Sequence, residues 1–171
     1  PLEVTTGTSS SSVTAVLRGG KPGPTVLLRG DMDALPLQEE TGLAYASEID
    51  GSMHACGHDT HIAMLASAAR LLSSRRDALA GQVVFMFQPG EEGQHGARHM
   101  LDEGVLDAAG TPVEKAFALH ITSTLQSGVV ICRPGPTMAS ADTFHITVKG
   151  RGGHGGMPHD ALDPVPPAAA M

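Results

Sequence analysis

The sequence has few aromatic side chains, no surplus of positive charge and no long apolar run. Aromatic residues make up 3% of its 171 residues and tryptophan is absent, so it lacks the stacking platforms that bind single-stranded nucleic acids. Lysine and arginine total 11 against 18 aspartates and glutamates, for a formal net charge of −7, which disfavours a phosphate backbone as partner. No apolar run approaches the ~20 residues that a membrane-spanning helix requires. We therefore expect neither a nucleic-acid partner nor a membrane partner.

Cysteine is also scarce. Cys56 and Cys132 do not make a disulfide framework, although a single bridge between them stays open at this point. A reducing, cytoplasmic setting is the better interpretation, and it leaves Cys56 free to bind a metal. The first residues, 1–4, carry neither a methionine nor the basic and apolar regions of a signal peptide. They do not resemble a natural beginning, so we expect the native protein to extend further.

Glycine and histidine are abundant by contrast. The 21 glycines indicate many tight turns or close backbone approaches. The 9 histidines are a large number of potential metal ligands and acid–base groups. Hydrophobic residues make up 41% and charged residues 17%, a composition typical of globular proteins.

Short apolar runs of strand length alternate with helical patterns along the first two thirds of the chain. Uninterrupted apolar runs are typical of strands that are buried on both faces. The alternation predicts an α/β fold with a mixed, mainly parallel sheet flanked by helices. We expect strands at 13–17, 25–28, 82–87 and 116–119, helices at 60–72, with an N-cap near His58 or Asp59, and 97–102, and turns at 8–12 and 19–24.

The pattern changes near Arg133. Phe144, Ile146 and Val148 alternate with polar residues, which predicts a strand over 143–149 with one wet face. Residues 163–171 resemble a helix start. We place a domain boundary within 134–137, so that residues 1–135 form one domain and residues 136–171 begin a second, incomplete one.

Polar side chains gather where the predicted strands end and where the first helix begins. Because ligands bind outside the carboxyl ends of strands in open α/β sheets, we expect these side chains to meet at one edge. Thiolate, imidazole and carboxylate together suit a borderline divalent ion such as zinc or manganese rather than calcium. The members are Asp31, Asp33, Cys56, His58, Glu91, Glu92 and His120.

The paired glutamates offer a division of labour. Side chains of successive residues diverge, so one of Glu91 and Glu92 can bind metal while the other faces the substrate as a general base. Gly57 allows the backbone to bend so that Cys56 and His58 can reach one or two ions.

Each of these residues alone also has a structural explanation, and only their joint placement favours a metal site. Paired glutamates in a glycine-rich loop are usually a solvated turn, and Asp-x-Asp is common turn chemistry. A lone cysteine is more often a buried inert thiol. His58 and His61 could be helix-cap and surface residues, His120 a core histidine, and His95, His99 and His145 surface residues.

Five segments together resemble the M20 metallopeptidase family. Within it they are most similar to the amidohydrolase branch of hippurate hydrolases, N-acyl-amino-acid amidohydrolases and indole-acetyl-amino-acid hydrolases. The order and spacing match along essentially the whole chain. The segments are residues 28–36 (LRGDMDALP), 53–59 (MHACGHD), 87–93 (FQPGEEG), 118–120 (ALH) and 152–159 (GGHGGMPH).

The resemblance implies a zinc-exopeptidase-like catalytic domain in residues 1–135, followed in 136–171 by the start of an α+β lid or dimerisation domain. It implies a hydrolase that cleaves N-acyl amino acids, or similar amides and peptides, to a carboxylate and an amino acid. It further implies two divalent ions (zinc, manganese, nickel or cobalt) and a homodimer or higher oligomer. The implied metal ligands are Cys56, His58, Glu92 and His120; Glu91 is the implied general base, Asp33 an orienting carboxylate and His154 a lid histidine that steadies the oxyanion, often in the partner subunit's site.

The chain also departs from the family pattern. Family members extend beyond both ends and supply a further ligand histidine, and Pro166 and Pro167 stand where helix formers are usual. The alternative is therefore a truncated, catalytically inactive metal-binding fragment of such an enzyme. A zinc deaminase would need H-x-E and P-C-x-x-C signatures, and the sequence has neither.

Overall fold

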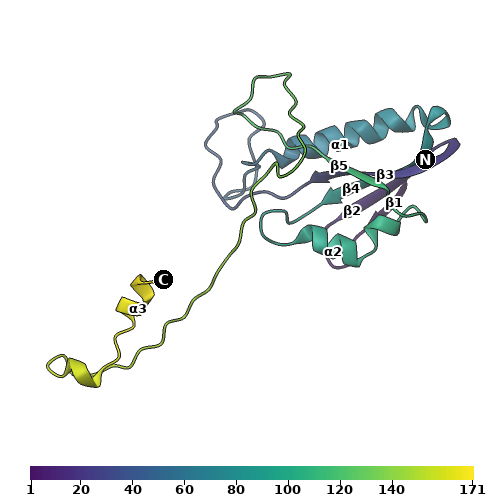
Figure 1. Cartoon of the computed structure of the whole chain (residues 1–171). Coiled ribbons are helices and arrows are strands. Elements are labelled where there is room, and N and C mark those ends of the chain that lie inside the picture. Colours follow the sequence, from purple (N-terminus) through teal and green to yellow (C-terminus); the bar gives the residue numbers. More distant parts are fainter. The chain divides into compact units, whose positions relative to one another are not determined.

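The computed structural model describes residues 1–171, which form two compact units, Pro1–Gln126 and Ser127–Met171 (Figure 1). The expected domain boundary, between residues 135 and 136, lies further along the chain and stays a prediction. None of the helices is long and apolar enough to cross a membrane.

The first unit is built on a mixed five-stranded sheet with the order β1-β2-β4-β3-β5. The β1–β2 and β2–β4 pairs are antiparallel, whereas β3 pairs in parallel with both β4 and β5. This arrangement confirms the expected α/β class with a mixed sheet. The strands are β1 (Glu3–Thr6), β2 (Val13–Arg18), β3 (Lys21–Asp31), β4 (Ala80–Gln88) and β5 (Lys115–Ala118).

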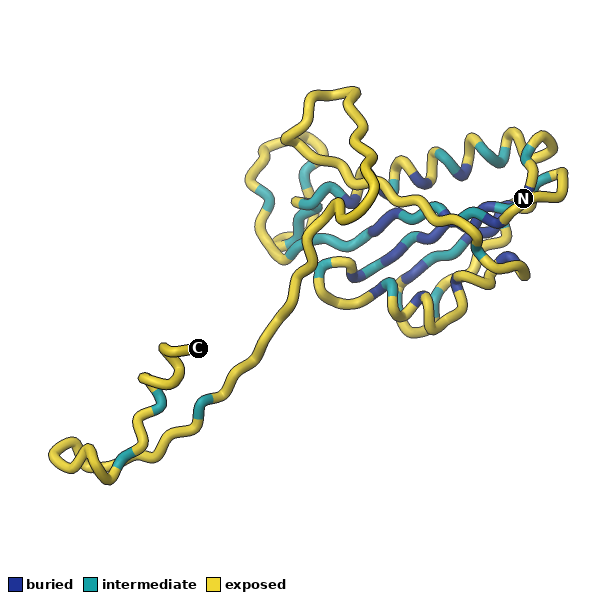
Figure 2. The backbone as a smooth tube through the Cα atoms, viewed as in Figure 1, coloured by how far each residue is buried: buried dark blue, intermediate teal, exposed yellow.

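Helices cover both faces of this sheet. The helix α1 (His58–Ser73) packs on one face, where its Leu65 and Ala69 meet Phe85 of β4. The helix α2 (Gly96–Asp102) and the 3₁₀ turn η2 (Val105–Asp107) pack on the other face, against Val84. Successive residues of a strand point to opposite faces, so the apolar run of β4 supplies both cores, seen as dark blue in Figure 2. A further 3₁₀ turn, η1 (Arg76–Ala78), joins α1 to β4.

Two local expectations for the sheet are wrong. The expected turn at 19–24 is largely strand, because β3 begins at Lys21 and pairs with β4 through a register shift between Lys21 and Thr25. That irregularity tolerates two prolines that a regular ladder would not. The strand β5 was expected to be buried, yet Phe117 is 58% exposed, because β5 is an edge strand that pairs only with β3.

The second unit contains little regular structure. Its elements are a 3₁₀ turn, η3 (Pro158–Asp160), an isolated bridge between Arg151 and Leu162, and the helix α3 (Val165–Ala169). The expected helix start is confirmed, and Pro166 and Pro167 lie in its first turn, where missing N–H groups cost little. The expected strand over 143–149 is wrong: these residues pair with no strand, and a strand exists only through its partner's hydrogen bonds.

Candidate metal centre

Three parallel strands end at the same edge of the sheet and deliver the predicted residues there. The strand β3 ends at Asp31, directly opposite Gln88 at the end of β4, and β5 ends just before Leu119. The loops that follow carry Asp33, the pair Glu91–Glu92 and His120. The expectation that the strand ends gather these side chains is therefore met by the described geometry.

The start of α1 brings Cys56 and His58 to this edge. The N-cap was expected near His58 or Asp59 and is the adjacent Gly57, whose φ of 85° is a left-handed conformation that favours glycine. A Cβ at Gly57 would also lie 2.4 Å from Cδ1 of Ile121. The bend and the close packing both require glycine, and they allow Cys56 and His58 to face one place.

His58 is fully buried and its two ring nitrogens have different roles. Its Nδ1 lies 3.0 Å from the backbone carbonyl oxygen and 3.2 Å from Oδ1 of Asp33. Both oxygens only accept hydrogen bonds, so Nδ1 carries the proton and Nε2 presents a lone pair. That Nε2 has no hydrogen-bond partner, and its nearest carboxylate oxygens are Oδ2 of Asp31 at 3.6 Å and Oε1 of Glu92 at 4.0 Å. A buried lone pair facing carboxylates fits a cation, and a carboxylate behind the other nitrogen is the usual support of a metal-binding histidine.

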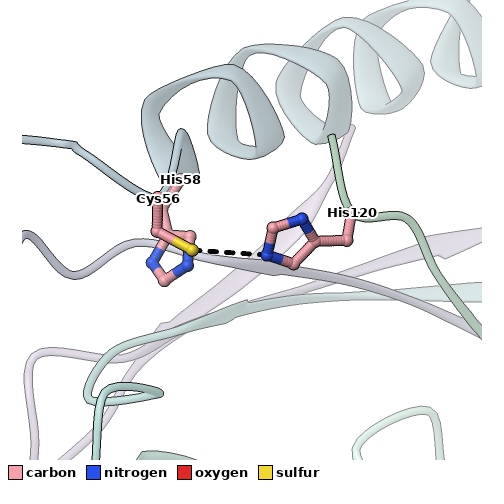
Figure 3. Close-up of side chains that lie close together, drawn as sticks. All are labelled: Cys56, His58 and His120. Atoms are coloured by element: carbon pink, nitrogen blue, oxygen red, sulfur yellow. Dashed lines mark hydrogen bonds between the residues drawn. The ribbon is translucent and has the colours of Figure 1, made fainter. Parts of the chain in front are cut away.

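Cys56 and His120 lie beside His58 and carry side chains that could bind the same ion. Figure 3 shows the Cys56 Sγ directed at Nε2 of His120, 3.3 Å away. Nδ1 of His120 donates to the carbonyl oxygen of Ile121, which leaves Nε2 available to bind an ion. The ligand atoms of Cys56, His58 and His120 all lie within 4.8 Å of one another. One thiol and two imidazoles are ligands that zinc-like ions prefer.

The negative charges of the carboxylates at this edge favour the binding of a cation. Burial raises the pKa of the Cys56 thiol, and the carboxylates of Glu92 and Glu91 raise it further. A bound divalent ion reverses this effect, because a coordinating thiol is deprotonated. Burial would raise the pKa of Asp33 as well, but the backbone N–H groups of Glu92 and Glu91 outweigh it and hold that pKa below its ordinary value.

Asp33 thus remains a carboxylate that connects two parts of the site. Its Oδ1 accepts from His58, and its Oδ2 accepts from the backbone N–H of Glu92 at 2.8 Å. Carboxylate oxygens of Glu91 and Glu92 lie within 4.8 Å of a ring nitrogen of His58. Glu92 is half-buried whereas Glu91 is exposed. This arrangement suits a ligand and a solvent-facing base, the roles expected from the paired glutamates.

One buried residue behind the site was not predicted. His61 is 3% exposed, so its interpretation as a surface residue is wrong. It bonds to Asp31, a predicted member of the group, which is 1% exposed. The signal was present in the spacing, because His58, His61, Leu65 and Ala69 recur at helical intervals on the buried face of α1.

The remaining histidines of interest and the second cysteine lie outside this group of side chains. His154 lies in the second unit, exposed, where its Nδ1 accepts the N–H of Gly156 at 3.1 Å; its expected role stays a prediction. His95, His99 and His145 are exposed, as expected for surface residues. Cys56 and Cys132 are both free thiols, so the bridge that had stayed open does not form.

Comparison with known proteins places this chain in a family. Residues 27–165 match the profile of Peptidase family M20/M25/M40. The chain is 48% identical over 157 residues to Thermostable carboxypeptidase 1 of Saccharolobus solfataricus, a match that covers 91% of this chain and 39% of that protein. It is 46% identical over 161 residues to N-acetylcysteine deacetylase of Bacillus subtilis, covering 94% of this chain and 41% of that protein.

A solved structure agrees with these matches. The Bacillus subtilis YXEP protein, described as a dinuclear metal-binding peptidase of the M20 family, superposes with a TM-score of 0.65 at 43% identity, over 71% of this chain and 33% of that one. The chain spans about two fifths of the length of the curated relatives it matches. By the extent of the profile match, the chain belongs to Peptidase family M20/M25/M40.

Proposed function

We propose that this chain supplies the metal centre of a hydrolase that cleaves the amide bond of N-acyl amino acids, or of similar amides and peptides. The observation that carries the proposal is the buried, unpartnered Nε2 of His58, held by Asp33 and facing a thiol, an imidazole and a glutamate. Relatives named carboxypeptidase and N-acetylcysteine deacetylase support the same reaction type, since both names denote amide hydrolysis.

Four side chains would hold the ions. Bound divalent ions such as zinc, manganese, nickel or cobalt would polarise the scissile carbonyl and make a water more acidic. The proposed ligands are Cys56, His58, Glu92 and His120, with two ions shared among them.

Glu91 is the proposed proton carrier. Its carboxylate takes a proton from water as the water oxygen forms a bond to the carbonyl carbon. The same group then gives that proton to the nitrogen as the carbon–nitrogen bond breaks. The products are a carboxylate and a free amino acid. Asp33 positions two of the proposed ligands, because it accepts hydrogen bonds from the His58 ring and from the backbone N–H of Glu92.

His154 and the assembly belong to the proposal as well. A ring N–H of His154 would stabilise the negative charge that develops on the carbonyl oxygen, as oxyanion donors do in other hydrolases. It would act in its own site or in that of a partner subunit, within a homodimer or higher oligomer. A small N-acyl amino acid as substrate and the cytoplasm as location complete the proposed setting.

The paired glutamates provide the test. Glu91→Gln should retain zinc and lose hydrolysis of N-acetylated amino acids, whereas Glu92→Gln should lose zinc, measured by metal content and by release of the free amine. Glu40→Gln, at the exposed second residue of the pair Glu39–Glu40, is the matched control and should change neither. Equal loss of metal in the Glu91 and Glu92 variants would refute the assigned roles.

The second candidate is a metal-binding chain without hydrolysis of its own. It is favoured by the fraction of the relatives' length, about two fifths, that this chain spans. The same assay separates the two. Zinc binding that depends on Glu92 without amine release from any N-acetylated amino acid supports this candidate, and absence of zinc binding contradicts both.

A further inference from the structure

We propose that His61, fixed by Asp31, is a positioning residue that holds the metal ligand His120 in place through the backbone of Ile121. Asp31 lies at the end of β3, His61 lies one turn into α1, and Ile121 follows β5. The residues therefore link three elements behind the candidate metal centre. The inference rests on the proposed function for the role of His120, whereas the link itself is independent of it.

The hydrogen bonds fix the protonation of His61. The backbone N–H of Ile121 donates to Nε2 of His61 at 3.0 Å. A ring nitrogen that accepts carries no proton, so the proton of a neutral ring is on Nδ1, which donates to Oδ1 of Asp31 at 2.5 Å. Asp31 is itself held by the guanidinium of Arg29, with Nη1 2.7 Å from Oδ2. His61 thus bridges a fixed carboxylate and the residue after His120.

His61 also packs against both ligating imidazoles. Its ring centroid is 5.0 Å from that of His120 in an edge-on arrangement, and 5.5 Å from that of His58 in a stacked one. His120 is exposed and follows an exposed edge strand, and apart from Cys56 its side chain bonds only to the carbonyl oxygen of Ile121, the residue that His61 holds. The hydrogen bond to Ile121 is therefore the anchor that keeps His120 facing Cys56.

His61 is not itself a metal ligand in this arrangement. Ligand atoms of Asp31, His58 and His61 lie within 4.8 Å of one another, which by distance alone would permit an ion. Both nitrogens of His61 are already occupied, however, one as donor to Asp31 and one as acceptor from Ile121. The unpartnered nitrogen of this group belongs to His58, which faces the centre.

Two conservative variants separate positioning from folding. His61→Gln places an amide oxygen near the position of Nε2 and restores an acceptor for the Ile121 N–H. His61→Asn reaches Asp31 but is too short to reach Ile121. Leu65→Ala is the control: Leu65 lies one turn further along the buried face of α1, with no polar link to His120.

The experiment measures zinc affinity by chelator competition, with circular dichroism to verify folding, in the 171-residue chain with Cys132→Ser. His61→Asn should weaken zinc binding about 10–100-fold, the usual loss when the support of a ligand is removed. His61→Gln should stay close to the parent chain. Leu65→Ala should lower the melting temperature and leave the affinity unchanged at temperatures where the chain is folded.

Amide exchange of Ile121 in the metal-free chain provides the second readout. The amide should be protected in the parent and in His61→Gln, and should exchange faster in His61→Asn. Parent-like affinity in His61→Asn, or equal weakening in Leu65→Ala, would overturn the positioning role. If the parent binds no zinc while the Ile121 amide follows the expected pattern, the proposed function fails and the link from His61 to Ile121 stands.

Discussion

Each of the two units contains an apolar pattern that predicts a strand, and only the first unit forms that strand. In Pro1–Gln126 the run Val83–Phe87 is a central strand with a neighbour on each side and a helix over each face. In Ser127–Met171 the alternating residues 144, 146 and 148 pair with nothing, and Phe144 is 81% exposed. An apolar pattern makes a strand only where another strand accepts its hydrogen bonds and another layer covers its side chains.

The predicted site residues of the two units also differ in how firmly neighbouring elements hold them. Every residue that the structure gathers at the candidate metal centre lies in the first unit, held by strand ends, by the start of α1 and by Asp33. In the second unit, the His154 side chain has only the N–H of Gly156, two residues away, as a hydrogen-bond partner. Hydrogen bonds between elements fix a side chain's direction, whereas a local bond within a glycine-rich loop constrains it far less.

The largest expected effect comes from exchanging one phenylalanine in each unit for alanine. Phe85→Ala should lower the free energy of unfolding by about 3–5 kcal/mol, because it removes a fully buried ring from the core against α1. Phe144→Ala should change it by less than about 0.5 kcal/mol, because that ring is already in water. Urea unfolding followed by circular dichroism measures both, and equal losses would mean that the second unit has a core as well.

The reactivity of the two cysteines, one in each unit, provides a chemical comparison of the units. Zinc should protect Cys56 from alkylation and leave Cys132 reactive, because Cys56 faces two histidines whereas Cys132 is exposed. Alkylation with and without zinc, and again after chelation, followed by peptide mass spectrometry, reads the two sites separately. Equal labelling of Cys56 in all three states would show that it is not a ligand.

A smaller effect tests the contact between α2 and the β1–β2 hairpin. Glu103 accepts hydrogen bonds from the backbone N–H groups and hydroxyls of Thr8 and Ser9, and these lower its pKa to about 2. A lowered folded-state pKa contributes stability that is present above the unfolded value of 4.5 and is lost as the pH falls towards about 2.

Glu103→Gln should therefore lower the melting temperature slightly at pH 7 and by a shrinking amount below pH 4.5. Thermal melts between pH 2 and pH 7 measure this difference. Asp107→Asn, nearby in η2 and without a side-chain hydrogen bond or ion pair to the hairpin residues, is the control. A constant difference across the whole range would mean that the carboxylate's charge is irrelevant to the contact.

The sequence by itself determined most of the first unit. Uninterrupted apolar runs predicted β3 and β4, the repeat from Thr60 to Leu72 predicted α1, and parallel strands require their carboxyl ends to lie at one edge. The sequence therefore predicted that the residues at this edge lie in one neighbourhood: Asp31, Asp33, Glu91, Glu92 and His120. Composition and local pattern suffice to predict these elements, because a strand that is buried on both faces requires an uninterrupted apolar run, which few other structures explain.

Only the tertiary structure decided the rest. It placed His61 behind the site, because the interpretation of a histidine as a surface residue or as a support depends on what packs against its helix face. It selected Gly57 as the N-cap, since the close approach of Ile121 is a contact between distant segments. It left β5 exposed and residues 143–149 without a strand, because strand formation depends on partners that a local pattern does not specify.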